Sequence, residues 1–203
     1  MAKGEETRQA ILTRAFEVAK MVGLSGLSIG RLAEETGLSK SGLFAHFGSK
    51  EALEVAVVEE AARQFVAFVM VPALRQPRGE PRVRALFERW VTWGDQPGGC
   101  FFVGAIAELD DRTGPPRDAL VQTCKDWLDT LATAARITVA EGQFRADLEP
   151  DQFAFEVYSI MLGFHAYQKF LRDPASRARA LDALERLIVS ALPATHPPTS
   201  RPR

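Results

Sequence analysis

The chain has 203 residues with 25 Lys or Arg and 26 Asp or Glu, and its formal net charge of −1 argues against a protein that binds nucleic acid over its whole surface. Two cysteines are too few for a disulfide framework and lack metal-ligand spacing, so we expect no metal site and no cofactor. Since no apolar run reaches the ~18 residues that span a membrane and the N-terminus lacks a secretion signal, we expect a cytoplasmic protein without a membrane partner.

Helical periodicity runs through nearly the whole chain and no strand pattern stands out, which predicts an all-α fold with about nine helices. The first helix is expected over roughly residues 5–21, followed by glycines. Ser28 is expected to begin a short second helix, Ser39 a third helix that ends at Phe47, and Ser49 a fourth, long helix that ends near residue 71.

The remainder of the chain carries five further predicted helices, at about residues 82–93, 100–109, 117–141, 151–171 and 176–192. A cluster of proline and glycine after residue 71 marks a boundary. We therefore predict a three-helix head over residues 1–50, a connecting helix over 50–71, a helical body over 72–192 and a Pro-rich, disordered tail over 193–203.

Residues 36–53, TGLSKSGLFAHFGSKEAL, have the pattern of the second half of a helix-turn-helix. Gly37 suits the positive φ of a tight turn, and Ser39 suits the cap of the next helix. From Leu38 to Lys50 there are two lysines and no acid, so this helix can approach phosphates without repulsion. Residues 1–50 hold seven basic and five acidic residues, and a basic head on an acidic body suits a DNA-reading module.

The segment LSIGRLAEETGLSKSGLFAHFGSKEAL, residues 27–53, resembles the DNA-binding signature of TetR-family transcriptional regulators, and the match extends over about residues 5–58. Residues 99–120, GCFFVGAIAELDDRTGPPRDAL, resemble the ligand domains of one subgroup of that family. The resemblance implies a bacterial regulator, usually a repressor, that binds a palindromic operator in double-stranded DNA as a homodimer. It also implies that the body, residues 72–192, binds a small-molecule effector and dimerises.

The resemblance places the third helix in the major groove and assigns DNA contacts by position. The residues so assigned are Lys40, Ser41, Gly42, Phe44, Ala45, His46 and Lys50, although a lone histidine such as His46 is often only a packed or surface residue. Ser28 and Ser39 start helices, where a hydroxyl can hold a phosphate oxygen, and Arg31 either approaches the DNA backbone or is solvated. Lys40 can donate to guanine O6 and N7 or can touch phosphate only. Phe44 stands where the family usually has tyrosine, and the missing hydroxyl removes a phosphate hydrogen bond worth about 0.5–1.5 kcal/mol. Phe44 can instead contact a thymine methyl, or it can pack against other residues of the protein.

Aromatic residues on the body helices are candidate effector contacts, although most aromatic residues at helical spacing belong to a core. The candidates are Trp90, Trp93, Phe101, Phe102, Trp127, Tyr158, Phe164 and His165. The few charges among them favour an apolar or aromatic effector of modest size. Cys100 follows two glycines at a helix start, where a thiol can become reactive, so a redox or electrophile signal is an alternative. The commoner role of such a cysteine is that of a small buried hydrophobe.

The last two helices are rich in large apolar residues: Phe153, Val157, Ile160, Met161 and Phe164 on one, and Leu181, Leu184, Ile188 and Leu192 on the other. These residues either form the body's own core or pair with their copies in a second subunit as a four-helix bundle. The sequence shows no Gly-rich phosphate loop or nucleophile elbow, which argues against an enzyme. A helical protein-interaction module without specific DNA binding is the remaining alternative.

Overall fold

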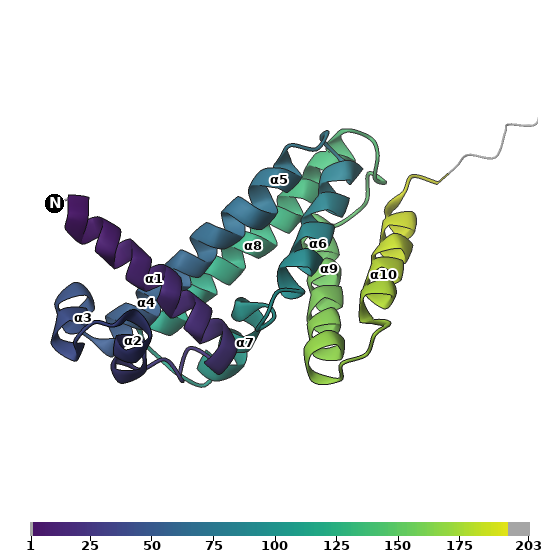
Figure 1. The fold of residues 1–203 in the computed structure, drawn as a ribbon. Helices are drawn as coiled ribbons and strands as arrows, with labels where there is room; N and C mark the ends of the chain where they lie inside the picture. Colours follow the sequence, from purple (N-terminus) through teal and green to yellow (C-terminus); the bar gives the residue numbers. More distant parts are fainter. Residues whose placement is uncertain (1, 195–203) are drawn as a thin grey trace, which may run out of the picture. The chain divides into compact units, whose positions relative to one another are not determined.

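A computed structural model describes residues 2–194 of the chain, and side chains from residue 4. The described part consists of helices, turns and loops, and it contains no strand, which confirms the predicted all-α fold (Figure 1). The disordered tail predicted over 193–203 lies outside the described residues from position 195 on.

The N-terminal helices and the connecting segment begin and end close to the predicted positions. They are α1 Ala2–Val22, α2 Ile29–Thr36, α3 Lys40–Phe47, α4 Lys50–Phe65, the π-helix η1 Val66–Met70 and α5 Val71–Leu74. The later helices are α6 Glu80–Gly94, α7 Phe101–Leu109, α8 Pro115–Ala140, α9 Pro150–His165, the π-helix η2 Ala166–Phe170 and α10 Ser176–Ala191. Because α4, η1 and α5 follow one another without a break, as do α9 and η2, the described residues form nine continuous helices.

Serine caps define the starts of α2, α3 and α4. The hydroxyls of Ser28, Ser39 and Ser49 each accept a hydrogen bond from the backbone N–H three residues further on, at 3.0–3.1 Å. Each bond satisfies a donor that the first turn of a helix leaves without a partner. Gly37 ends α2 with φ of 70°, a left-handed conformation that glycine adopts at little cost. The predicted caps and turn are therefore confirmed.

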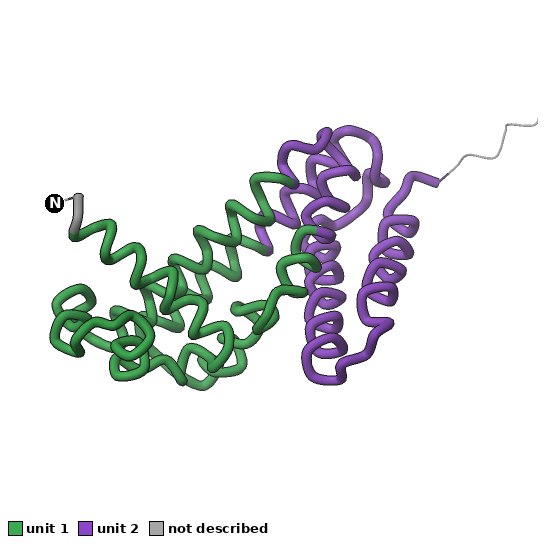
Figure 2. Tube along the Cα trace, viewed as in Figure 1, with its two compact units in different colours: residues 1–72, 89–127 green, residues 73–88, 128–203 purple. Residues whose placement is uncertain are grey.

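The chain packs as two compact units, shown in different colours in Figure 2. Unit 1 comprises residues up to 72 together with 89–127, and unit 2 comprises 73–88 together with the chain from 128. Unit 1 therefore holds the head, most of the connecting helix and α7. This division follows packing, and the predicted functional boundaries near residues 50 and 72 stay a prediction.

The connecting helix, residues 50–74, departs from the predicted pattern at its π-helical turn. Leu53, Val57, Ala61 and Phe65 recur at helical spacing in the sequence and are buried. Phe68, for which the same spacing predicts burial, is 36% exposed, and Val69 is buried instead. The N–H of Val71 donates to the carbonyl of Val66, five residues back. Such a turn winds through fewer degrees per residue than an α-turn, so Val69 reaches the buried side and Phe68 does not.

In unit 2, α9 and α10 pack side by side (Figure 1). The buried side chains on them include Phe153, Val157, Met161, Phe164, Leu184 and Ile188. These residues form the core of unit 2, which is the first of the two predicted alternatives, and the pairing of the two helices with a second subunit stays a prediction. A subunit contact on these helices needs the exposed residues of their other faces. None of the helices in the described range combines the length and the apolar character needed to cross a membrane.

Candidate nucleic-acid interface and its link to the connecting helix

Helix α3 presents an exposed face that carries no acid. Its exposed residues are Lys40, Ser41, Phe44 and Ala45. Gly42 and His46 are half-buried, while Leu43 and Phe47 are buried on the opposite side and fix the helix to the head. The exposed residues recur at spacings of one, three and four, so they share one side of the helix. Most of the positions assigned to base contact therefore lie on one accessible face.

The serines assigned to phosphate contact also cap helices. Ser28 and Ser39 use their hydroxyl oxygens to accept the cap hydrogen bonds, and the oxygen of Ser39 lies 3.1 Å from that of Ser41. A hydroxyl that accepts a hydrogen bond can still donate its own proton. Capping is therefore compatible with donation to a phosphate from the same side chain. Arg31, on the first turn of α2, is exposed.

The two lysines assigned to DNA contact have different surroundings. Lys40 is exposed and extends along Gly30 of α2, where an added Cβ would lie 3.8 Å from its Nζ. Lys50 donates to the backbone carbonyl of Ser25 at 3.2 Å, and its Nζ lies 3.5 Å from a carboxylate oxygen of Glu54. An ammonium group has three protons, so Lys50 retains capacity for a phosphate while the α1–α2 turn and α4 fix its position.

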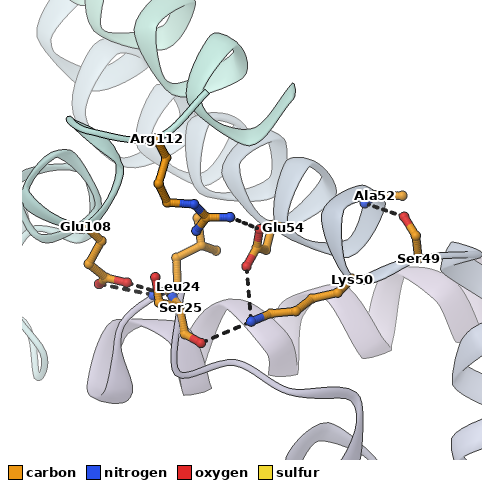
Figure 3. A network of polar contacts seen from close by, with 8 residues as sticks. All are labelled: Leu24, Ser25, Ser49, Lys50, Ala52, Glu54, Glu108 and Arg112. Atoms are coloured by element: carbon orange, nitrogen blue, oxygen red, sulfur yellow. Dashed lines mark hydrogen bonds and ion pairs between the residues drawn. The ribbon is translucent and has the colours of Figure 1, made fainter. Parts of the chain in front are cut away.

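The α1–α2 turn is bound from the other side by Glu108 of α7 (Figure 3). The Glu108 carboxylate accepts hydrogen bonds from the backbone N–H groups of Leu24 at 3.2 Å and Ser25 at 2.6 Å. Bonds to a carboxylate are stronger than those to a neutral acceptor. Gly23 has φ of +83°, and a Cβ there would lie 2.3 Å from the carboxylate. The close approach of Glu108 and the backbone angle therefore both require glycine at position 23.

A buried carboxylate on α4 extends this network (Figure 3). The side chain of Glu54 is 1% exposed, with Arg112 Nη2 at 3.3 Å from one oxygen and Lys50 Nζ at 3.5 Å from the other. A buried carboxylate is stable only when cations or donors compensate it. Arg112 lies in the loop after α7, so α7 and its loop hold both the α1–α2 turn and α4 at Glu54. The orientation of the helix-turn-helix is thereby coupled to α7.

Four of the eight predicted effector residues gather in one aromatic cluster of unit 1. Trp93, Phe102 and Trp127 meet the ring of Phe65 edge-on, with centroids 5.6, 5.5 and 5.0 Å away, and Phe101 packs on Phe102 at 5.5 Å. Edge-to-face contacts of this kind stabilise a packed core. These residues are 4–8% exposed, so ring packing accounts for most of their burial.

The other four candidates lie outside this cluster, and they are divided between the two units. Trp90 is buried in unit 1, whereas Tyr158, Phe164 and His165 belong to unit 2. His165 is half-buried, and its Nδ1 has no hydrogen-bond partner among the described residues. Burial, and then the nearby charge of Lys169, lower the pKa of His165 to about 4, so the imidazole is neutral near pH 7.

The cysteines occupy sheltered positions. Cys100 is the N-cap residue of α7 and is 1% exposed. Cys124 is half-buried, and burial, with a smaller effect of Cys100, raises the pKa of its thiol to about 11, which keeps it protonated near pH 7. Burial restricts direct access of an oxidant to Cys100, and its redox role stays a prediction. Across residues 4–194, no three His, Cys, Asp or Glu side chains are grouped so that they could hold a metal ion.

Sequence reasoning missed the network of Glu54, Glu108 and Arg112. The opposite charges of Lys50 and Glu54, four residues apart on one helix, were a signal for part of it. Glu108 gave no such signal, because it binds backbone groups more than 80 residues away in the chain.

Two family models match the chain. The model described as bacterial regulatory proteins, tetR family, matches residues 11–57, which include α2, α3 and the capping serines. The model described as tetracyclin repressor-like, C-terminal domain, matches residues 79–184, which is more than half of the chain. Together they include most of the described helices.

Individual proteins are similar over nearly the whole length. The HTH-type transcriptional repressor NemR of Escherichia coli strain K12 is 23% identical over 192 residues, which cover 91% of this chain and 95% of NemR. A TetR transcriptional regulator from Chloroflexus aurantiacus has a similar crystal structure, with a TM-score of 0.87, 25% identity, and coverage of 95% and 98% of the two chains. AibR, solved in complex with isovaleryl coenzyme A and operator DNA, shares the fold with a TM-score of 0.69 at 21% identity, over 92% and 98% of the two chains.

Proposed function

The chain belongs to the TetR family of transcriptional regulators, and we propose that this DNA-binding regulator is a homodimeric repressor, released from a palindromic operator by a small apolar or aromatic effector. It combines a DNA-binding head with a ligand-binding C-terminal domain, matched over residues 11–57 and 79–184. The observation that carries the proposal is the exposed, acid-free face of α3, set between serine-capped helix starts.

Base readout requires a helix that can enter the major groove with donors at its first turns. Lys40 and Ser41 are exposed there, next to the half-buried Gly42, which leaves room for a base edge. The hydroxyls of Ser28 and Ser39 lie at helix starts, which supports a role in fixing the register through contacts to phosphates. Phe44 is 53% exposed, which suits contact with a thymine methyl.

Exposed apolar residues on α9 and η2 support a dimer. Phe155, Leu162 and Tyr167 are 64%, 37% and 46% exposed, and they lie with the small residues Gly163 and Ala166 on the face opposite the core. An added Cβ at Gly163 would meet no atom within 4 Å, so the backbone is open to close approach by another helix. A dimer places two copies of α3 on one palindrome.

Effector control is supported by the network that links α7 to the head. Glu108 and Arg112 hold the α1–α2 turn and α4, so an effector that favours another position of α7 or of the connecting helix would shift the population of DNA-binding conformations. Repression as the outcome is supported by NemR, which is a transcriptional repressor, and effector control by AibR, which was solved with both a ligand and operator DNA.

Selection of bound fragments from random DNA, at near-physiological salt, tests the proposal. We expect a palindrome with half-sites about one helical turn apart. A parallel selection with Lys40→Glu, which reverses the charge on α3, is expected to recover no such site. Enrichment of a single half-site would contradict the dimer, and equal, salt-sensitive binding to all sequences would contradict base readout.

A further inference from the structure

Three charged side chains of unit 1 meet near the start of α4 (Figure 3). The buried carboxylate of Glu54 lies between Lys50, one turn earlier on the same helix, and Arg112 of the loop after α7. Arg112 Nη2 lies 3.3 Å from Oε2 of Glu54, and Lys50 Nζ lies 3.5 Å from Oε1. Because two cations face one carboxylate, this charge triad of Lys50, Glu54 and Arg112 carries a net charge of +1.

Glu54 depends on these two cations for compensation of its charge. Its side chain is 1% exposed, so water does not solvate the carboxylate. Among the described residues, the only hydrogen bond to this carboxylate comes from Arg112, and it reaches Oε2. Oε1 accepts no hydrogen bond there and faces Lys50 only as an ion pair. A buried carboxylate is costly unless cations or donors compensate it, so each cation reduces the demand on the other.

Lys50 is the member of the triad that the resemblance assigns to a DNA phosphate. Its side chain is 50% exposed, and its ammonium group donates to the carbonyl of Ser25 at 3.2 Å. The ion pair with Glu54 is not a hydrogen bond, which leaves ammonium protons for a further acceptor. A phosphate that approaches Lys50 therefore competes with Glu54 for the charge of the same ammonium group.

We propose that Arg112 is a positioning residue for DNA binding, because it compensates Glu54 and so leaves the charge of Lys50 available to a DNA phosphate. The inference rests on the proposed function in that Lys50 contacts DNA. With Arg112 in place, a phosphate faces a triad of net charge +1. Without its guanidinium, Lys50 and Glu54 form a neutral pair, which attracts a phosphate far less.

The position of Arg112 in the chain connects this charge to α7. Arg112 follows the end of α7, at Leu109, by three residues, and Glu108 on that helix binds the α1–α2 turn. A displacement of α7 or its loop would withdraw the guanidinium from Glu54 and lower the net charge beside the phosphate from +1 to 0. DNA affinity would then fall even if the helix α3 kept its orientation.

Removal of the guanidinium charge tests the inference, by fluorescence anisotropy with the full chain and a labelled duplex at several salt concentrations. Arg112→Gln keeps a hydrogen-bond donor for Glu54 but removes the charge. We expect affinity to fall about three- to tenfold for every sequence, and the slope of log affinity against log salt concentration to become shallower by as much as in Lys50→Ala. Arg117→Gln removes the same charge at a residue of α8 that is not part of the triad, and it should leave both unchanged.

A second substitution separates compensation of Glu54 from a structural role of Arg112. In Glu54→Gln/Arg112→Gln the site regains a net charge of +1, because Lys50 no longer faces a carboxylate, so affinity and salt slope should return to wild-type values. Glu59→Gln removes an acid from the exposed side of the same helix, and in the Arg112→Gln background it should restore neither. A structural role of Arg112 predicts instead that the losses from the two substitutions multiply.

Circular dichroism of each variant checks that it is folded. The inference is overturned if Arg112→Gln keeps wild-type affinity and salt slope, if Glu54→Gln fails to restore them, or if Glu59→Gln restores them equally well. If Arg112→Gln alone does not fold, the double variant, which has no carboxylate at this site, decides. Wild-type affinity of the double variant supports the inference, and a lower affinity overturns it.

A random-sequence duplex keeps this test separate from the proposed function, because phosphate contacts do not depend on sequence. A wild type that selects a palindrome but is insensitive to Arg112→Gln contradicts this inference only. If the wild type selects no palindrome, but affinity for the random duplex falls in Arg112→Gln and returns in the double variant, only the proposed operator is contradicted. A wild type that binds no duplex contradicts both.

Discussion

The carboxylate of Glu108 lies 2.6 Å from the backbone nitrogen of Ser25, so a side chain of α7 forms part of the turn that precedes the helix-turn-helix. The position of the head in unit 1 is set by a group more than 80 residues further along the chain.

Loss of this carboxylate should weaken both folding and DNA binding. In Glu108→Ala, two backbone donors of the α1–α2 turn lose their charged acceptor, and we expect the free energy of unfolding to fall by about 1–2 kcal/mol. Urea denaturation and operator titration measure the two effects. Asp111→Ala removes the same charge from an exposed position two residues after α7 and should change neither. Equal effects of both variants would show that net charge, not the hydrogen bonds, is responsible.

Lys40→Ala should relax sequence preference at one position of each half-site. A lysine that donates to guanine contributes about 1–3 kcal/mol of discrimination against other bases. Titration of single-base variants of the selected operator measures it. Lys50→Ala is the matched comparison. It should weaken binding to all sequences equally and reduce the slope of log affinity against log salt concentration by about one. If Lys40→Ala weakens binding to every sequence alike, Lys40 touches phosphate only.

Phe44→Tyr should strengthen DNA binding. Because Phe44 is 53% exposed on α3, a hydroxyl added there can reach solvent-facing phosphate, and one hydrogen bond corresponds to a gain of about two- to tenfold in affinity. Fluorescence anisotropy with labelled operator measures the change. Phe170→Tyr, at a phenylalanine of η2 that is 85% exposed, should leave affinity unaltered. Unchanged affinity of Phe44→Tyr would indicate that Phe44 faces away from the phosphates.

A charge on the exposed face of α9 should separate the subunits. Leu162 is 37% exposed beside Gly163, and an arginine there would be desolvated in a helix-to-helix contact. Sedimentation velocity should show a monomer for Leu162→Arg and a dimer for the wild type. Val66→Arg places the same charge at a residue of η1 that is 43% exposed and should remain dimeric. If Leu162→Arg remains a dimer, the subunit interface does not include this face of α9.

The stability of the protein should fall in mild acid through His165. Burial favours the neutral imidazole, with a folded pKa of about 4 against the ordinary value of 6.5 in the unfolded chain. The unfolded state therefore binds more protons between these values, so this contribution to stability is complete above pH 6.5 and is lost as pH falls toward 4. His165→Gln should flatten the difference in unfolding midpoint between pH 7 and pH 5. An unchanged pH dependence would show that other groups control it.

Local chemistry allowed much of the fold to be predicted. The hydroxyls of Ser28, Ser39 and Ser49 cap helices within three residues of themselves, and Gly37 supplies a turn, so each signal and its consequence lie together in the sequence. The exposed face of α3 follows from helical periodicity in the same way.

Long-range contacts explain what could not be predicted. Glu108 and Arg112 bind groups brought to them by the packing of unit 1, and no periodicity encodes that pairing. The aromatic candidates showed helical spacing, but spacing does not separate a ring that packs in the core around Phe65 from one that a ligand can reach. The exposure of Phe68 depends on a single π-helical turn, which leaves no mark in an apolar pattern of mean period 3.6.

That turn also determines where this chain can change in length. The wide turn between Val66 and Val71 accommodates an extra residue while Phe65 before it and Ala73 after it both stay buried. Deleting one residue within η1 would leave a regular α-helix with its two ends still in phase. The same deletion elsewhere in the connecting helix would rotate one half against the other by about 100°, the angle of one α-helical residue. Homologues that differ by one residue in this helix should therefore differ within η1.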